Sequence, residues 1–349
     1  MADGLADAIK ALAGGRSLGV SETADAFSVI MRGDATPVQI AALLAGLRVK
    51  GETADEVAGA AQALRRVMRR VEVTSPETLV DTCGTGGGEV GTFNISTAAA
   101  FVAAGAGVRI AKHGNRSFTT KCGSADVLEA LGVAIEVPLE RLPRVLSDAG
   151  IMFMFAPAMH PAMRHVGPVR RELGIPTVMN IVGPLANPAG VLRQVVGVAD
   201  SRRLVMLAGA LQRLGAVHAM VVHGAPGIDE ISPLGPTFVA EVRDGAVREW
   251  TIDPGHYGLR VASAAELAGS EPAYNAILME ELLSGGGSEG ARSAVALNAA
   301  AAIYVSGLGP DFGAGLDAAR AAMANGSARA ALERLRLATN APWAPPPAA

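Results

Sequence analysis

The chain has 349 residues, which corresponds to about two domains of ordinary size. Half of the residues are hydrophobic and 18% are charged, so the chain can bury a large core, which excludes an intrinsically disordered protein. With 30 basic and 33 acidic residues the net charge is −3, which argues against non-specific binding of nucleic acid or of an acidic membrane. An anionic ligand would therefore have to be bound by a local group of donors.

The sequence also favours a cytoplasmic location. Cys83 and Cys122 are too few for a disulfide framework or a four-thiolate zinc site, and they fit a reducing compartment. The first ten residues include two aspartates and lack the apolar stretch of a signal peptide. The longest uncharged run, 173–192, contains three prolines that would break a membrane-spanning helix. We expect a cytoplasmic protein that associates neither with membranes nor with nucleic acid.

Helix start signals dominate the first seventy residues. Thr36 followed by Pro37 is typical of an N-cap with proline at the first helical position. Thr53 and Glu56 have the spacing of a capping box, which opens a helix expected to run to about residue 70. We predict a small helical domain over residues 1–72, joined by part of the proline-interrupted stretch 160–190, which fits neither a helical nor a strand pattern.

A basic cluster lies at the end of that second helix. Cations at this place stabilise the negative end of the helix dipole, so a solvated helix end is the favoured interpretation and a nucleic-acid-binding face is the alternative. We assign no function to the cluster. It consists of Arg65, Arg66, Arg69 and Arg70.

From about residue 78 onward, short apolar runs alternate with helical stretches. This alternation predicts an α/β domain over 73–340, with a mostly parallel central sheet and helices on its faces. The small helical domain would pack on this larger one, and residues 341–349 are expected to form a disordered tail. The expected strands cover 78–82, 108–111, 151–155, 195–198 and 217–222, and the expected helices cover 96–104, 125–131, 139–148 and 202–214.

The strongest local signal is the glycine-rich segment 81–97, DTCGTGGGEVGTFNIST, between the first expected strand and the following helix. Glycines let backbone N–H groups approach an anion closely, and the helix that follows adds free N–H groups and the positive end of its dipole. Asn94, Ser96 and Thr97 add polar side chains that a purely structural turn, the alternative, does not need. We interpret the segment as a phosphate-binding loop.

Two common phosphate-binding loops do not fit this segment. It lacks the Gly-Lys-Ser/Thr ending of a nucleoside-triphosphate loop. Gly86, Gly88 and Gly91 match the dinucleotide pattern G-x-G-x-x-G, but that pattern requires an acidic residue at the end of the next strand. The basic sequence KHGNRS, 112–117, occupies that place, which disfavours NAD binding.

Two further loops complete the candidate site. The segment 112–124 is rich in cations and hydroxyls and has no acid before Asp126, which indicates a second anion site, with a solvated basic loop as the alternative. Two adjacent anion sites suggest a ligand with separated phosphates. Asp229 and Glu230 follow another expected strand, and such hard oxygen ligands hold Mg²⁺ together with substrate phosphates, although acid pairs are also common on surfaces.

Taken in order along the chain, the motifs resemble the anthranilate phosphoribosyltransferase family. The resemblance extends to about residue 335 and has one departure, Gly88, where the family usually has Asp. It rests on the motifs GTGG at 84–87, NIST at 94–97, KHGNRS at 112–117, FAP at 155–157, RH at 164–165, PVR at 168–170, NIVGPLANP at 180–188, HG at 223–224 and DE at 229–230.

The resemblance implies a nucleoside phosphorylase/phosphoribosyltransferase-like fold and a homodimer formed through the helical part. It also implies transfer of the phosphoribosyl group of phosphoribosyl pyrophosphate to anthranilate, with Mg²⁺, in tryptophan biosynthesis. Anthranilate would contact Gly84, Asn115 and Arg170, and Mg²⁺ would contact Ser96, Asp229 and Glu230. Phosphoribosyl pyrophosphate would contact Gly84, Gly87, Gly88, Thr92, Asn94, Ile95, Ser96, Thr97, Lys112, His113, Gly114, Asn115, Arg116, Ser117, Thr120 and Ser124.

The chemistry of that reaction agrees with the residues. Breaking the anomeric C–O bond leaves extra negative charge on pyrophosphate, which Mg²⁺, Lys112 and loop N–H groups would stabilise. The aromatic amine is already neutral and needs positioning, so no acid or base is required, and His113 is the only candidate for such a role. Arg170 suits the anthranilate carboxylate. The rival hypotheses are a pyrimidine nucleoside phosphorylase and a related fold that binds nucleic acid.

Overall fold

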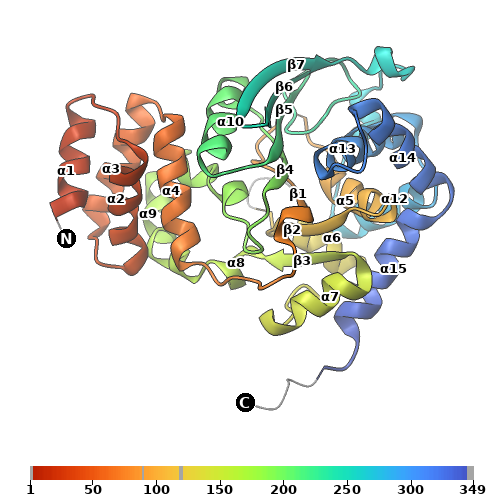
Figure 1. Ribbon diagram of the computed structural model, residues 1–349, viewed down its shortest axis with the longest axis horizontal. Helices are drawn as coiled ribbons and strands as arrows, with labels where there is room; N and C mark the ends of the chain where they lie inside the picture. The colour runs from red at the N-terminus through yellow and green to blue at the C-terminus, as the bar shows by residue number, and fades with distance from the viewer. Residues whose placement is uncertain (1–2, 89, 118–120, 344–349) are drawn as a thin grey trace.

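The computed structural model of the protein describes residues 3–88, 90–117 and 121–343 (Figure 1). A group of helices lies at one end of the molecule, and a sheet flanked by helices forms the rest. The predicted fold class, a small helical domain packed on an α/β domain, is confirmed. The expected tail 341–349 lies outside the described residues from position 344 onward.

The N-terminal helices form around the predicted caps. The Thr36 hydroxyl accepts from the backbone N–H of Gln39, and the Thr53 hydroxyl accepts from that of Glu56, each at 3.3 Å, so both helix starts are confirmed. The helix that follows Thr53 is α4, and it ends at Val67, three residues before the expected end. The four helices are α1 (Asp3–Ala13), α2 (Val20–Arg32), α3 (Pro37–Lys50) and α4 (Ala54–Val67).

The proline-interrupted stretch packs against these helices. Val166, Val169 and Leu185 are buried in the same apolar cluster as the facing sides of α2, α3 and α4. The stretch therefore links the end of a strand to the helical part before the chain re-enters the sheet. It contains α8 (Ala156–Met159), η3 (Pro161–His165), α9 (Gly167–Leu173), η4 (Val178–Asn180) and η5 (Gly183–Leu185).

This contact corrects one expectation about the basic cluster. Arg65 is not solvated: its Nε donates to the backbone oxygen of Leu185 at 2.7 Å, across the junction between α4 and the returning stretch. Burial, with the nearby Arg70 cation as a second cause, lowers the pKa of Arg65 to about 10. The interpretation as a solvated helix end was wrong for this residue because the returning chain covers the end of α4.

Among the described residues, one sheet has the strand order β3-β2-β1-β4-β5-β6-β7. The first five strands are parallel and correspond to the five that we expected, while β6 and β7 extend the sheet in antiparallel fashion and were not expected. The strands are β1 (Leu79–Gly84), β2 (Arg109–Gly114), β3 (Ile151–Phe155), β4 (Arg193–Gly197), β5 (His218–Gly224), β6 (Thr237–Arg243) and β7 (Ala246–Ile252).

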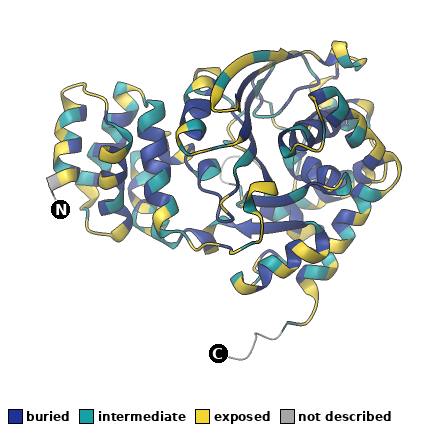
Figure 2. Cartoon of the chain, viewed as in Figure 1, coloured by how far each residue is buried: buried dark blue, intermediate teal, exposed yellow. Residues whose placement is uncertain are grey.

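Helices cover both faces of this sheet, and buried residues line the two contacts (Figures 1 and 2). Along β5, Met220 and Val222 belong to the core shared with α5 and α13, while Ala219 and Val221 belong to the core shared with α10 and the helical part. This alternation is the period of two of a strand buried on both sides.

The helices of this part are α5 (Ile95–Gly105), α6 (Ser124–Ala130), α7 (Leu142–Ala149), α10 (Leu204–Arg213), α11 (Ala264–Leu267), α12 (Pro272–Leu283), α13 (Glu289–Ser306), α14 (Phe312–Ala324) and α15 (Ser327–Asn340). Short 3₁₀ turns are η1 (Pro76–Thr78), η2 (Leu139–Arg141), η6 (Ser201–Arg203) and η7 (Pro254–Tyr257). Within the described ranges, no helix is long and apolar enough to cross a membrane.

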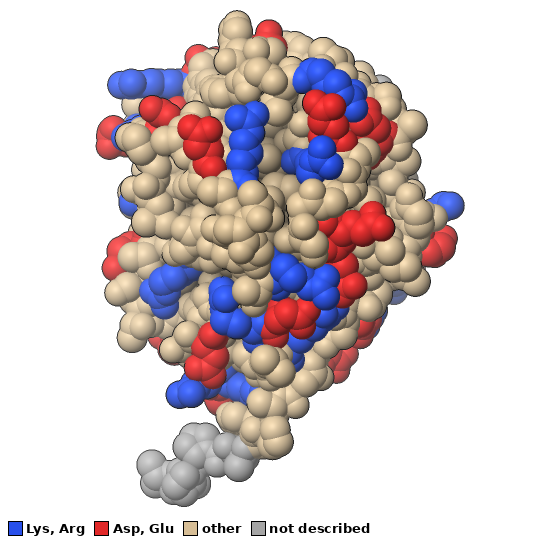
Figure 3. Space-filling view, turned by 90° about the vertical axis from the view of Figure 1, so that its right-hand side faces the viewer, with Lys and Arg blue, Asp and Glu red and all other residues tan. Residues whose placement is uncertain are grey.

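The face over the C-terminal helices carries basic and acidic side chains next to one another (Figure 3). On α15, for example, Arg329 and Glu333 form an ion pair at 2.9 Å one helical turn apart. Such partly exposed pairs between residues one helical turn apart contribute little to stability, on the order of 0.3–0.5 kcal/mol each. The fold is therefore held mainly by the two apolar cores on either side of the sheet.

Candidate active site

The candidate site lies where the direction of the strand order reverses. After β1 the chain builds β2 and β3 on one side of it and β4 and β5 on the other, so β1 and β4 are the switch point of the sheet. Ligands of open parallel sheets bind at such a point, beyond the carboxyl ends of the strands. The loops 85–94, 115–123 and 225–231, which follow β1, β2 and β5, are the three loops that the sequence singled out.

The carboxylate loop is packed directly onto this switch point. Gly84 and Gly197 are paired at the ends of β1 and β4, and a Cβ at either position would collide with Asp229. Both glycines are therefore required for Asp229 to reach the site. Gly86 and Gly87 have φ values of 72° and 83°, which only glycine adopts readily.

Hydrogen bonds join the carboxylates to the phosphate loop. The backbone N–H of Gly86 donates to Asp229 Oδ2 at 2.8 Å, and that of Ser96, in the first turn of α5, donates to Glu230 Oε1 at 3.0 Å. A Cβ at Gly88 would lie 3.6 Å from Asp229 Oδ1. The Asp that the family usually has at this position would thus bring a third carboxylate close to the pair, and this chain lacks it.

Lys112 is a buried cation beside this pair. Its Nζ donates to the backbone oxygen of Thr82 and lies 3.5 Å from the Thr82 hydroxyl and 3.4 Å from that of Ser96. Burial lowers the pKa of Lys112, and the charges of nearby acids oppose that effect. The ammonium group therefore joins β1 to the start of α5, where the backbone N–H of Ser96 donates to Glu230.

The surroundings of the Asp229 and Glu230 carboxylates supply too little positive charge to compensate for their burial. Burial raises the pKa of Asp229, and burial together with the Asp229 charge raises the pKa of Glu230 to about 8. In the described part of the chain, no group of three or more His, Cys, Asp or Glu side chains could hold a metal. Two carboxylates with a neighbouring hydroxyl are nevertheless the oxygen ligands with which Mg²⁺ is held beside substrate phosphates.

A buried pair, Asp81 and Asn187, hydrogen-bonds to the backbone of β2 just before the second loop. Asp81 accepts from the backbone N–H of His113 at 3.2 Å and from Asn187 Nδ2 at 2.8 Å, and Asn187 Nδ2 also donates to the backbone oxygen of Ala111 at 2.9 Å. Burial raises the pKa of Asp81 to about 6, although the Lys112 charge opposes it. Asp81 and Asn187 fall within motifs that we noted, but we had assigned them no role.

His113 lies against a second histidine that sequence reasoning missed. The Nε2 atoms of His113 and His160 are 3.2 Å apart, and their rings meet edge to face. Burial is the main cause that lowers the pKa of His113 to about 3 and that of His160 to about 4. Both imidazoles are therefore neutral at pH 7, and the Nε2–H group of one donates a hydrogen bond to the Nε2 atom of the other. Nothing in the sequence brings residues 113 and 160 together, because His113 lies in β2 and His160 lies after β3 and α8.

The second anion loop is fixed mostly by its own contacts. The backbone oxygen of Asn115 accepts from the Ser124 hydroxyl at 3.2 Å. Arg116 pairs with Asp126 and Glu129 on α6, and its guanidinium carbon lies 5.7 Å from the centroid of the Phe155 ring. The guanidinium thus has protein partners here, and its contact with phosphate stays a prediction. Thr120 lies outside the described residues.

Asn94 ties this loop to the first one. Its Nδ2 donates to the backbone oxygen of Cys122 at 3.0 Å, and its Oδ1 accepts from Asn275 Nδ2 at 3.1 Å. Asn275, on α12, accepts in turn from the backbone N–H of Ser270 at 2.8 Å. Asn275 lies 181 positions away from Asn94, and no motif marks it.

The remaining predicted residues include Arg170, which no hydrogen bond or ion pair between described residues joins to these loops. Arg170 is half-buried on α9, burial lowers its pKa, and no ion pair with another described residue is formed. No hydrogen bond within the described ranges joins Arg170 to Gly84 or Asn115, so the anthranilate contacts stay predictions. The first loop contains Gly87 and Thr92, and the first turn of α5 contains Ile95 and Thr97. Gly114 is the last residue of β2, Ser117 lies in the second loop, and Ser124 is the first residue of α6.

Comparison with known proteins identifies the family. The model of the glycosyl transferase family α/β domain matches residues 76–329, and that of its helical bundle domain matches residues 6–68. The anthranilate phosphoribosyltransferase of Rubrobacter xylanophilus is 51% identical over 330 residues, 95% of this chain and 96% of the relative. That of Chloroflexus aggregans is 50% identical, over 94% and 96% of the two chains.

Solved structures agree. Anthranilate phosphoribosyltransferase from Thermus thermophilus has a TM-score of 0.90 and 43% identity, covering 96% of this chain and 100% of the other. The Saccharomyces cerevisiae enzyme in complex with phosphoribosyl pyrophosphate and Mg has a TM-score of 0.86 and 30% identity, covering 96% and 97%. This chain therefore belongs to the anthranilate phosphoribosyltransferase family.

Proposed function

We propose that this protein transfers the phosphoribosyl group of phosphoribosyl pyrophosphate to the amine of anthranilate. The products are N-(5-phosphoribosyl)anthranilate and pyrophosphate, in tryptophan biosynthesis. One observation carries the proposal: a glycine-rich loop, a basic loop and a carboxylate pair meet at the switch point between β1 and β4. A ligand with two separated phosphates and a divalent cation needs these three parts in one place.

Mg²⁺ is the proposed cofactor, held by Asp229, Glu230 and the Ser96 hydroxyl. The residues fit the ion, because two desolvated carboxylates with raised pKa values are short of positive charge. When bound, Mg²⁺ supplies charge stabilisation to the departing pyrophosphate. The yeast relative bound to phosphoribosyl pyrophosphate and Mg supports the same choice of ion.

The leaving group and the acceptor would be handled by different residues. Lys112 and the N–H groups of the glycine-rich loop stabilise the negative charge that develops on pyrophosphate as the anomeric C–O bond breaks. Arg170 holds the anthranilate carboxylate as a planar fork, and Gly84 and Asn115 border the ring. A yeast relative was solved with 4-fluoroanthranilate, an analogue of this acceptor.

No proton has to be removed before the amine attacks, because an aromatic amine is neutral at pH 7. Catalysis then rests on proximity and on charge stabilisation. The neutral His113–His160 pair suits this chemistry, since it offers hydrogen bonding next to the site without adding a charge. A pKa of about 3 makes His113 a poor proton acceptor, so its proposed role is hydrogen bonding, and solvent takes the proton that the amine loses after bond formation.

We further propose a homodimer formed through α3. Val38 and Val49 on this helix are 77% and 86% exposed, and Ala42 and Ala45 lie between them on the same face. The spacing of four, three and four residues forms one apolar stripe. An exposed stripe of this kind marks an interaction surface, and a second copy of the chain supplies the same stripe in return.

The direct test follows the fluorescence of anthranilate in the presence of the purified protein. We expect anthranilate to be consumed only when phosphoribosyl pyrophosphate and Mg²⁺ are both supplied. A protein that splits uridine with inorganic phosphate and leaves anthranilate unchanged would be a nucleoside phosphorylase instead.

A further inference from the structure

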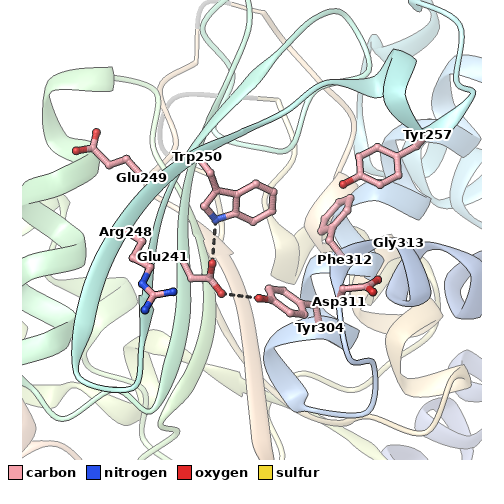
Figure 4. Close-up of a pocket in the computed structure, with 9 residues that line it drawn as sticks. All are labelled: Glu241, Arg248, Glu249, Trp250, Tyr257, Tyr304, Asp311, Phe312 and Gly313. Atoms are coloured by element: carbon pink, nitrogen blue, oxygen red, sulfur yellow. Dashed lines mark hydrogen bonds between the residues drawn. The ribbon is translucent and has the colours of Figure 1, made fainter.

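A cavity lined by none of the candidate active-site residues lies elsewhere in the molecule. It has a volume of about 550 Å³ and opens between the β6–β7 hairpin and the helices α13 and α14 (Figure 4). None of its lining residues is among the residues predicted to bind phosphoribosyl pyrophosphate, anthranilate or Mg²⁺. Its volume lies within the range of small-molecule sites, roughly 300–1,000 Å³.

The walls of this cavity are unusually aromatic for this chain. The sequence has two Trp, three Tyr and eight Phe residues, and four of these thirteen line the cavity. Trp250 and Phe312 meet edge to face with ring centroids 6.2 Å apart, and Tyr257 lies 5.2 Å from Phe312. Trp250, Tyr257 and Tyr304 remain only half-buried, so their rings form the walls of a cavity rather than a closed core.

Charges of both signs lie around the cavity. Glu241 and Asp311 supply two carboxylates and Arg248 one guanidinium, whereas the side chain of Glu249 points to the other side of β7 (Figure 4). Asp311 is exposed, which puts its charge where a ligand from solvent first meets the cavity. The Arg243 guanidinium lies 5.7 Å from the centroid of the Tyr304 ring, so the rings that remain for a ligand are those of Trp250, Tyr257 and Phe312.

Glu241, at the base of the cavity, fixes the aromatic walls. It accepts hydrogen bonds from Trp250 Nε1 at 2.9 Å and from the Tyr304 hydroxyl at 2.8 Å, and its carboxylate lies 2.7 Å from His218 Nε2. Burial would raise the pKa of Glu241, but the hydrogen bonds from His218, Tyr304 and Trp250 outweigh it and hold the pKa below its usual value. The base of the cavity is therefore ionised at neutral pH, and two of the rings are held in place before any ligand binds.

We propose that this cavity binds a small organic cation, an ammonium or quaternary ammonium group carried on an aromatic or aliphatic body. The faces of Trp and Tyr rings attract such cations, and attraction is stronger where the cation is partly desolvated. The ionised Glu241 carboxylate at the base and the Asp311 carboxylate at the rim add an attraction for positive charge. Pre-oriented rings reduce the entropy lost on binding.

The test uses benzyltrimethylammonium as the probe and the full-length protein. The Trp343→Phe variant leaves Trp250 as the only tryptophan, so the fluorescence reports on the cavity wall. We expect a saturable change in this fluorescence with the cation, and at least about tenfold weaker binding of neutral benzyl alcohol and of anionic phenylacetate. Equal binding of all three probes, or no saturable change, would overturn the proposal.

Two variants test the residues themselves by calorimetry. Trp250→Leu removes the best cation-binding ring, and Asp311→Asn removes the exposed negative charge while keeping a cap for α14. We expect each to weaken the binding of benzyltrimethylammonium about tenfold. The matched control, Glu136→Gln, changes one exposed acid elsewhere and should bind as the parent does.

Anthranilate turnover serves as the folding control for all of these variants, because none of the changed residues lies in the predicted substrate site. Variants that turn over normally and bind the cation as tightly as the parent would contradict the proposal. A protein that bound the cation and had no turnover would contradict only the proposed enzyme activity.

Discussion

Arg170 is the single side chain on which the assignment of the acceptor site depends. Its guanidinium is half-buried and pairs with no other described residue, so a ligand carboxylate would satisfy it. Arg170→Ala should remove a charge-assisted contact of about 1.5–3 kcal/mol, which raises the KM for anthranilate roughly 10- to 150-fold. The KM for phosphoribosyl pyrophosphate should change little.

The neighbouring Arg171 provides the matched control. It is exposed, and Arg171→Ala should leave both KM values as they are. Steady-state kinetics in which one substrate is varied at a time distinguish these cases. Equal losses for both substrates in Arg170→Ala would indicate a folding defect, and an unchanged KM for anthranilate would remove Arg170 from the site.

The carboxylate pair predicts how the enzyme responds to metal. Asp229→Asn with Glu230→Gln preserves shape but removes the charge that would hold Mg²⁺. We expect the Mg²⁺ concentration for half-maximal activity to rise at least about tenfold, since even outer-shell changes cost 10- to 100-fold in metal affinity. The control, Asp317→Asn with Glu281→Gln, removes two exposed acids and should not alter the magnesium titration. An unchanged titration in the site variant would show that these acids are structural.

The buried histidine pair predicts a loss of stability in acid. A histidine with a folded pKa of about 4 stays neutral in the fold but takes up a proton in the unfolded chain below about pH 6.5, so unfolding is favoured as the pH falls. For His160 this amounts to about 2 kcal/mol between pH 7 and pH 5. Urea unfolding should show a correspondingly smaller pH effect in His160→Asn than in the parent.

His256→Asn is the control for this experiment, because His256 is exposed and contacts neither buried imidazole. It should keep the full loss of stability between pH 7 and pH 5. If His160→Asn lost as much stability as the parent over this range, the imidazole would not be neutral in the fold.

At the scale of elements, three loops with separate origins act as one site because side chains connect them. The Asn275–Asn94 hydrogen bond couples α12 to the glycine-rich loop. The Asn94 Nδ2 atom in turn donates to the backbone oxygen of Cys122 in the basic loop. Asn275→Ala should raise the KM for phosphoribosyl pyrophosphate about 2- to 12-fold, as expected for the loss of one such bond. It should leave the KM for anthranilate nearly unchanged.

Tyr274→Ala is the matched control on the same helix, since Tyr274 is 54% exposed. It should change neither KM. If Asn275→Ala behaved like Tyr274→Ala, the Asn94 side chain would be held by its other contacts alone.

The parallel strands were predictable because buried parallel strands are short apolar runs followed by polar or glycine-rich turns. The β6–β7 hairpin was missed because its strands mix apolar and charged residues: one face of β7 is exposed. A signal was present, however. Asp244 and Gly245, with φ values of 52° and 73°, form the two-residue turn that the Asp-Gly pair favours in hairpins.

Within the site, residues on sequence motifs were predictable, and their supports were not. Ser96 lies in the first turn of α5, Lys112 lies near the carboxyl end of β2, and Asp229 and Glu230 follow β5. Each of them belongs to a segment whose polar or glycine-rich composition indicates its chemistry. His160 and Asn275 act by meeting residues far away in the chain, and only the fold brings them there. Single-sequence patterns carry no information on such long-range contacts.

At the scale of the whole molecule, two apolar cores hold different parts of the site. One lies between the sheet and α5, α13, α14 and α15, and the other joins the opposite face of the sheet to α10 and the N-terminal helices. The second core is continuous from the helical part to β4 and β5 and holds the returning stretch with Arg170, whereas Ile231 of the carboxylate loop belongs to the first core. A change in how the helical part is held would therefore act on the acceptor side first.

The α3 stripe gives the prediction for assembly. Val38→Glu with Val49→Glu places two charges in the proposed contact with a second copy, where they face the partner's identical charges and lose hydration. We expect the parent to elute as a dimer and this variant as a monomer when the mass is measured by light scattering after size-exclusion chromatography.

Leu337→Glu is the matched control, because Leu337 on α15 is 73% exposed and lies outside the stripe. It should leave the dimer intact. The monomeric double variant should keep its secondary structure, since neither valine belongs to the core, and it should bind phosphoribosyl pyrophosphate as the parent does, since all three loops of the site come from one chain. A variant that remained dimeric would move the interface away from α3. A monomer that could no longer bind phosphoribosyl pyrophosphate would mean that the partner subunit completes the site.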